Sequence, residues 1–205
     1  MGAAIVIGHN VYHVVPNEVP ILFVLGWISI RLRDGGWKTV GLGRPTSWKS
    51  TVGIALGVAA LRVSLGELVV QPAATRIWPR AAMAPPSGAS DIPHHPLYAL
   101  LALGIVWTFA AFGEEMSYRG YLLTRAADLG NRTRWAYWLA LVPVSVLFGY
   151  GHYYKGRVGM LDSGMAGLLL GGSYLLSRRN LWVPILAHGF IDTFAVIVAF
   201  LGLAK

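Results

Sequence analysis

The stretch from residue 97 to residue 127, LYALLALGIVWTFAAFGEEMSYRGYLLTRAA, decides the fold of this chain. It is long enough to cross a bilayer as a helix, which takes about 20 mostly apolar residues. Well inside its ends it nevertheless carries three charged side chains, Glu114, Glu115 and Arg119. A charged side chain at the centre of a bilayer costs roughly 2.5 to 3.5 kcal/mol on insertion scales, so such residues are functional candidates by default. The stretch therefore predicts a membrane span with polar chemistry inside it.

The composition of the whole chain agrees with a membrane protein. Of the 205 residues, 55% are hydrophobic and only 13% are charged, whereas soluble domains carry about 25% charged residues. A bilayer accepts the apolar exterior that this composition requires. We attribute the net charge of +8 to basic loops at the membrane surface, and we expect no nucleic-acid partner. Because the sequence contains 0 cysteines, disulfides, a thiol nucleophile and thiolate metal ligands are excluded.

Five further segments approach the length of a span. We therefore predict an all-α, multi-pass transmembrane helical bundle of about six spans, located in the cell membrane in contact with lipid. The whole chain, residues 1–205, is predicted to form a single integral membrane domain. The predicted spans are residues 19–30, 51–70, 97–127, 135–151, 163–176 and 181–203.

Two local patterns lie in and between these spans. The stretch 71–96 is rich in Pro, Ala and Ser, and it is predicted to form one long loop. Gly167 with Gly171, and Gly53 with Gly57, match the small-xxx-small pattern. That pattern is typical of helices that pack closely in membranes, so we expect both pairs at helix contacts.

The basic residues are unevenly distributed between the predicted loops. If six spans alternate, ten basic residues lie on one side, in segments 31–49, 125–134 and 178–179. Five lie on the other side, namely Arg76, Arg80, Lys155, Arg157 and Lys205. Because Lys and Arg gather in cytoplasmic loops, the first side is predicted to be cytoplasmic and the N-terminus to lie outside.

Two other predicted spans also end or begin with ionisable residues. His152 follows Phe148 by four positions, and Asp192 follows His188 by four. Residues at this spacing share one face of a helix, so the members of each pair are neighbours. The same spacing separates Glu115 from Arg119, which predicts that these two side chains pair.

The depth of these groups in the membrane can be estimated from helix rise. At about 1.5 Å per residue, Glu114 lies roughly 22 Å from the turn at 129–134, and His152 lies roughly 25 Å from it. His188 and Asp192 lie roughly 12 to 18 Å beyond the turn that precedes their own helix. The groups can therefore meet at similar depth within the membrane.

The three motifs, in this order, resemble those of a known family. They are EExxxR at Glu114–Arg119, FxxxH at Phe148–His152 and HxxxD at His188–Asp192. Together they are similar to the CPBP family of intramembrane proteases, which includes type II CAAX prenyl endopeptidases and bacteriocin-processing or immunity-related proteins. Residues 41–45, GLGRP, also look like the loop that often precedes the core of that family. The resemblance places the catalytic core motifs at residues 114–192.

The resemblance implies glutamate-dependent hydrolysis of a peptide bond in a membrane-associated protein or peptide, which is prenylated for the endopeptidases. By position, Glu114 would activate a water as general base, and His152 would help to hold that water. His188 and Asp192 would support the oxyanion. The residues that would order the site are Glu115, Arg119 and Phe148. The endopeptidases typically have Asn where this chain has Asp192, and an ionised Asp cannot donate a hydrogen bond, so Asp192 would alternatively orient His188 or bind a metal.

The chemistry leaves alternatives open. Hydrolysis of an amide needs an activated water and a stabilised oxyanion, and a divalent metal held by Glu114, His152 and His188 could supply both. No HExxH zinc motif is present in the sequence. Carboxylates and histidines within a membrane also relay protons, so a proton-coupled transporter is one alternative function. A non-catalytic membrane scaffold or immunity protein of the same fold is another.

Overall fold

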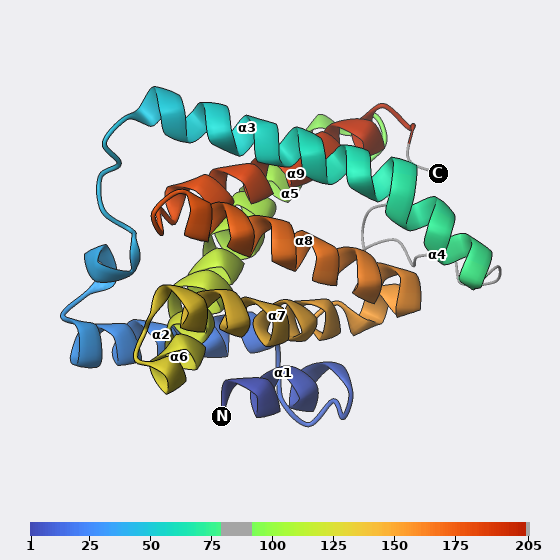
Figure 1. Ribbon diagram of the computed structural model, residues 1–205. Helices are drawn as coiled ribbons and strands as arrows, with labels where there is room; N and C mark the ends of the chain where they lie inside the picture. Colours follow the sequence, from blue (N-terminus) through green and yellow to red (C-terminus); the bar gives the residue numbers. More distant parts are fainter. Residues whose placement is uncertain (79–91, 204–205) are drawn as a thin grey trace.

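The computed structural model describes residues 1–78 and 92–203, and all of its regular structure in these ranges is helical. The N-terminal half contains α1 Gly2–Asn10, α2 Glu18–Asp34, η1 Trp37–Val40, α3 Trp48–Leu65, η2 Gly66–Val70 and α4 Gln71–Ile77. The motif helix consists of α5 Pro96–Ile105, η4 Val106–Glu114, η5 Met116–Leu122, α6 Leu123–Ala127 and η6 Asp128–Gly130. The C-terminal part contains α7 Arg134–Tyr150, η7 Tyr153–Lys155, α8 Gly156–Leu176 and α9 Trp182–Phe200. The predicted all-α fold class is confirmed (Figure 1).

Three helices in the described ranges are long and apolar enough to cross a membrane. They are Trp48–Ile77, which joins α3, η2 and α4, then Pro96–Gly130, and finally α9. The other predicted spans correspond to α2 and α7, which have 17 residues each, and to α8, which has 21. The structure therefore supports a helical membrane bundle with three clear candidate spans, rather than the full predicted count of six.

The predicted loop at 71–96 is wrong in its first part. Residues 71–77 form α4, which continues directly from η2 and α3. Pro72 lies inside the continuous helix Trp48–Ile77, just after the π-helical segment η2; local π geometry of this kind accommodates a proline within a membrane helix. Residues 79–91 of the predicted loop lie outside the described ranges.

The two small-residue patterns have different environments. A Cβ on Gly167 would lie 3.1 Å from Ser145 of α7, and a Cβ on Gly171 would overlap the side chain of Leu141. This pair therefore allows α8 to approach α7 closely, as predicted. The prediction is wrong for Gly53 and Gly57, which have open space where a Cβ would stand.

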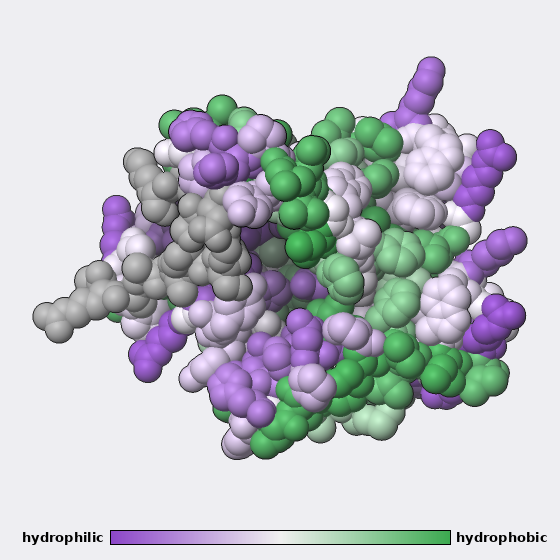
Figure 2. Space-filling view, turned by 180° about the vertical axis from the view of Figure 1, so that it is seen from behind, coloured by the Kyte–Doolittle hydropathy of each residue, from purple (hydrophilic) through white to green (hydrophobic). Residues whose placement is uncertain are grey.

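The loops that carry most of the basic residues gather at one end of the bundle. The N–H of Leu181 donates to the carbonyl of Gly41 at 3.1 Å, which joins the loop after α2 to the turn between α8 and α9. Arg125 and Arg132 both pair with Asp34, which joins the end of the motif helix to the end of α2. Long hydrophilic side chains protrude from the right-hand end of the molecule in Figure 2, and others protrude at the left. The predicted grouping of the basic loops is therefore present in the structure.

Gly41 is the point at which the loop after α2 is fixed. Its φ is +99°, and a Cβ at this position would overlap the carbonyl of Arg179. The indole N–H of Trp182 also donates to the carbonyl of Gly43 at 3.0 Å. The GLGRP segment is therefore attached through its backbone to the start of α9.

We expect Gly41→Ala to destabilise the protein, because alanine tolerates neither the positive φ nor the backbone contact. Residues held in such sparsely populated backbone regions cost roughly 1 to 3 kcal/mol, which thermal unfolding in detergent would detect as a lower Tm. Gly43→Ala is the matched control, since a Cβ on Gly43 meets nothing within 4 Å. Equal Tm values for the two variants would contradict this account of the loop.

Candidate active site

The three motifs, which are far apart in the sequence, converge on one buried cluster. Glu115 and Arg119 lie on the motif helix, Phe148 lies near the end of α7, and His188 lies on α9. The Phe148 ring is 6.2 Å from the His188 ring, and the guanidinium carbon of Arg119 is 4.4 Å from the centre of the Phe148 ring. The structure thus brings together side chains from all three motifs.

Glu115 is at the centre of this cluster. Its side chain is fully buried, and its Oε1 accepts hydrogen bonds from Arg119 Nη1 at 2.8 Å and from His188 Nδ1 at 2.8 Å. The predicted pairing of Glu115 with Arg119 is confirmed. The bond from His188 was not predicted, and it connects the motif helix directly to α9.

Arg119 extends the cluster to two more helices. Its side chain is buried, and Nη2 donates to the carbonyl of Gly167 in α8 at 3.3 Å. Its guanidinium also covers the ring of Phe148 in α7. A cation over an aromatic face is attracted by the ring quadrupole, so the Phe148 ring stabilises the buried charge of Arg119.

Glu114 has a different environment from its neighbour. Its Oε2 is buried, and it has no hydrogen-bond partner among the described residues. It interacts electrostatically with His188, Asp192 and Lys155. Consecutive residues of a helix point in different directions, which explains how Glu115 is bonded through Oε1 to two donors, with its Oε2 unpartnered, while Glu114 has no hydrogen bond among the described residues.

The two histidines are held in defined tautomers. Nδ1 of His152 is 2.9 Å from the carbonyl of Phe148, and a carbonyl only accepts, so this nitrogen carries the proton. When His152 is neutral, its Nε2 is therefore an acceptor. Nδ1 of His188 donates to Glu115, and its Nε2 lies 3.5 Å from Oδ2 of Asp192. Asp192 is thus placed beside His188, as the four-residue spacing predicted.

The candidate metal ligands do not form a metal centre in this arrangement. In residues 1–78 and 92–203, no group of three or more His, Asp or Glu side chains is arranged to hold a metal ion. His188 directs both of its ring nitrogens at carboxylates, whereas His152 uses only Nδ1, which donates to a backbone carbonyl. With His188 occupied in this way, the candidate set of Glu114, His152 and His188 lacks one of its three metal ligands.

Several residues near the cluster were not singled out in the sequence. Tyr118 is buried, and its ring meets the Phe148 ring edge-on at 4.9 Å. Tyr154 stacks on His152 with ring centres 6.0 Å apart. Glu18 of α2 is buried, and its Oε2 is 3.3 Å from Nε2 of His9. The positions of Tyr118 and Tyr154, within and just after two motifs, are the only sequence signal for them; nothing in the sequence indicates Glu18.

Gly189 sets the distance between α9 and the motif helix. A Cβ on Gly189 would lie 2.5 Å from the ring of Trp107 in η4. Trp107 is held in place by the hydrogen bond from its Nε1 to Thr193 Oγ1 at 3.1 Å and by edge-on contact with Phe190. The residue after His188 must therefore be small for His188 to reach Glu115.

Comparisons with known proteins agree with the motifs. Residues 96–194 match the family of type II CAAX prenyl endopeptidase Rce1-like proteins. The matched region contains all three motifs, from Glu114 to Asp192. The match confirms the resemblance to the CPBP family of proteases, and with the apolar helices it indicates a membrane protein with CAAX-type protease activity at the level of the family. No curated protein and no solved structure matches the chain.

We expect Arg119→Met to lower the free energy of unfolding by roughly 3 to 5 kcal/mol, because it leaves a buried carboxylate short of its main charge partner. Thermal unfolding in detergent measures the effect as a lower Tm. Arg134→Met is a suitable control, since Arg134 is exposed at the start of α7. A Tm for Arg119→Met equal to that of the control would mean that the pair contributes little.

We expect Gly189→Ala to lower both stability and activity, because the new methyl group displaces Trp107 and moves α9 away from the motif helix. Overpacking of this kind costs roughly 1 to 3 kcal/mol. Gly104→Ala is the matched control on the motif helix, where a Cβ meets nothing within 4 Å. That variant should be neutral or slightly stabilising, because alanine favours helix over glycine by about 0.5 to 1 kcal/mol. Unchanged unfolding and cleavage in Gly189→Ala would exclude this packing role.

Proposed function

We propose that this protein is an intramembrane endopeptidase in which Glu114 activates a water for attack on a peptide bond. The observation that supports it best is the contrast between two adjacent carboxylates. Oε1 of Glu115 accepts hydrogen bonds from both Arg119 and His188, whereas Glu114 has no hydrogen bond or ion pair among the described residues, and its Oε2 is buried. A general base needs a carboxylate that is free to take a proton, and Glu114 is the member of the pair with that freedom.

In the proposed reaction the Glu114 carboxylate takes a proton from water while the water oxygen attacks the carbonyl carbon. The tetrahedral intermediate then collapses as Glu114 passes the proton to the leaving nitrogen, and the C–N bond breaks. This sequence restores the carboxylate and consumes one water for each bond cleaved. Nε2 of His152 holds the water, because its Nδ1 proton is used by the Phe148 carbonyl and leaves Nε2 as an acceptor.

The oxyanion is assigned to His188. Its Nδ1–H is committed to Glu115, so His188 can donate to a substrate only from Nε2, and only in the doubly protonated form. Asp192, whose Oδ2 lies 3.5 Å from that nitrogen, orients the ring and favours its cationic form. This role suits a carboxylate better than oxyanion binding does, because an ionised Asp cannot donate.

The proposed substrate is a membrane-associated peptide or protein, with a prenylated C-terminus as the class that the Rce1-like family suggests. A groove of about 330 Å³ could hold an apolar group of the substrate near the site. Its lining residues are Trp107, Thr108, Phe112, Trp182, Ile185 and Leu186. The groove lies between η4 and α9, the segments that lead to Glu114 and His188. The proposal includes several membrane crossings in the cell membrane, in keeping with the three apolar helices.

We expect Glu114→Gln to reduce cleavage about 100-fold or more, which is the usual contribution of a general base, with Tm near the wild-type value. The assay uses the purified protein in detergent and a library of lipid-modified peptides, with products identified by mass spectrometry. Glu115→Gln is the matched comparison and should lower Tm as well as activity, because it removes a buried partner of Arg119 and His188.

The same assay run with a strong chelator tests whether a metal activates the water. We expect cleavage to persist, because no three His, Asp or Glu side chains of the described residues are arranged to hold a metal ion. Wild-type activity in Glu114→Gln would refute the mechanism. Loss of activity on chelation, restored by added Zn²⁺, would replace it with a metal-dependent one.

A further inference from the structure

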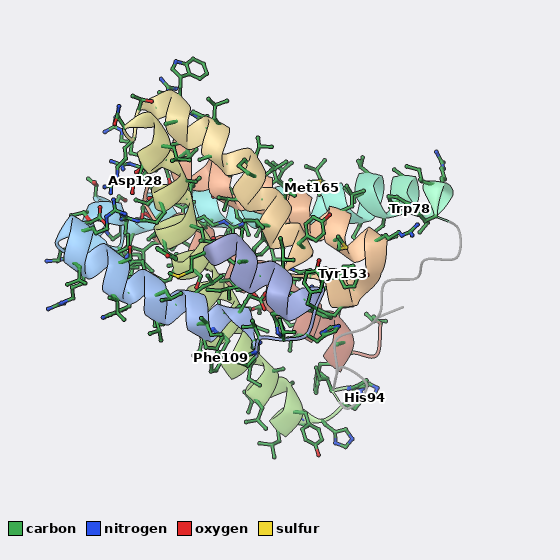
Figure 3. The ribbon with its side chains drawn as sticks, turned by 90° about the horizontal axis from the view of Figure 1, so that it is seen from below. Trp78, His94, Phe109, Asp128, Tyr153 and Met165 are labelled. Atoms are coloured by element: carbon green, nitrogen blue, oxygen red, sulfur yellow. The ribbon has the colours of Figure 1, made fainter. Side chains whose placement is uncertain are left out.

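The turn η7, Tyr153–Lys155, follows His152 directly and places a cation beside the site. The ring of Tyr154 stacks on that of His152 with centres 6.0 Å apart and planes at 27°. Nζ of Lys155 lies 5.6 Å from the centre of the Tyr154 ring. Lys155 is thus connected to the site residue His152 through one intervening aromatic ring. Tyr153 of the same turn lies well away from Asp128, which is at the basic end of the bundle (Figure 3).

The charges around Lys155 are mainly those of carboxylates. It is half-buried, and it interacts electrostatically with Glu114, Asp192 and Asp162. Asp162, however, is already paired with Arg62. No carboxylate in residues 1–78 and 92–203 lies within ion-pair distance of Nζ. Lys155 therefore supplies positive potential to the side of the site that holds Glu114 and Asp192, without forming an ion pair with either residue.

An ammonium group in this position suits a carboxylate of the substrate. Lysine offers three N–H donors, and hydrogen bonds to charged groups are among the stronger ones in proteins. Glu114 and Asp192 repel an anion, so a negative group on this side of the site is favoured next to the Lys155 ammonium. Ionised side chains are rare in membrane-embedded segments, so a substrate peptide in the membrane seldom carries an acidic side chain. The anion that it does carry is the carboxylate at its C-terminus.

We propose that Lys155 binds the free C-terminal carboxylate of the substrate peptide, so that the site selects a peptide bond close to the C-terminal end. The proposal rests on the proposed endopeptidase function and adds a specificity-determining residue to it. An extended peptide rises about 3.3 Å per residue, so the bond that reaches Glu114 lies a small, fixed number of residues from the carboxylate. Lys155 then measures the length of the released fragment.

A simpler role for Lys155 would be as a counter-ion that keeps Glu114 and Asp192 from repelling each other. The two roles predict different results. A counter-ion acts on every substrate alike, whereas a carboxylate receptor acts only on substrates with a free C-terminus. The experiment therefore varies the substrate terminus and the lysine together.

Two libraries of lipid-modified peptides are needed, identical except that one ends in a free carboxylate and the other in a carboxamide. We expect the wild-type protein to cleave the free acids about tenfold or more faster, the range expected for one charged hydrogen bond, with cuts at a constant distance from the C-terminus. Lys155→Met should bring the acid-to-amide ratio close to one, and Lys155→Arg should retain most of it. Arg157→Met, an exposed cation two residues further on, is the matched control and should keep the wild-type ratio.

The outcomes separate this inference from the function on which it rests. Equal cleavage of acids and amides by the wild-type protein, or an acid preference that survives in Lys155→Met, overturns the role of Lys155 and leaves the endopeptidase function standing. An acidic side chain that rescues the amides at a shifted position would equally overturn selection of the C-terminus. Cleavage of neither library would remove the proposed function and the inference together.

Discussion

The two hydrogen bonds that Glu115 accepts, from Arg119 and from His188, are the constraint on which the rest of the structure depends. A buried carboxylate is costly unless it is paired and hydrogen-bonded. The positions of Arg119 and His188 are therefore constrained by the need to keep their bonds to Glu115. Arg119 in turn bonds to Gly167 of α8 and covers Phe148 of α7. One network of side chains therefore fixes the motif helix against α7, α8 and α9, where apolar packing in lipid would leave their rotation less defined.

This network also determines what Glu114 can do. Adjacent positions on a helix point in different directions, so Glu115 is fixed by Arg119 and His188 while Glu114 interacts electrostatically with His188, Asp192 and Lys155. The cations that neutralise Glu115 are already committed, and Oε2 of Glu114 has no partner in the described part of the chain. The two neighbouring glutamates thus have different roles: Glu115 holds the helices together, and Glu114 is the proposed general base. One carboxylate could not do both, because hydrogen bonds to fixed donors would keep it from taking a proton.

The sequence predicted what depends on local spacing and missed what depends on how helices are placed against each other. Glu115 and Arg119 pair because residues four apart lie close together on a helix surface, which spacing alone predicts. The bond from His188 to Glu115 depends on the rotation of α9, which spacing does not define. For the same reason Gly53 carried a packing pattern yet faces open space, and Lys155 was counted only as a loop charge, since the turn η7 that aims it is not visible in the sequence.

In the proposed membrane arrangement, the length of α7 explains how water reaches the active site. Its 17 residues extend roughly 25 Å at about 1.5 Å per residue, which is shorter than the hydrocarbon core of about 30 Å. A helix that is too short for the bilayer thins it locally or draws polar flanking groups toward it. His152 follows the end of α7, and the half-exposed turn with Tyr153 and Lys155 comes next. In the proposed membrane arrangement, the end of α7 that leads to His152 is thus the end nearest a membrane surface, where water is available, whereas Glu115 is fully buried.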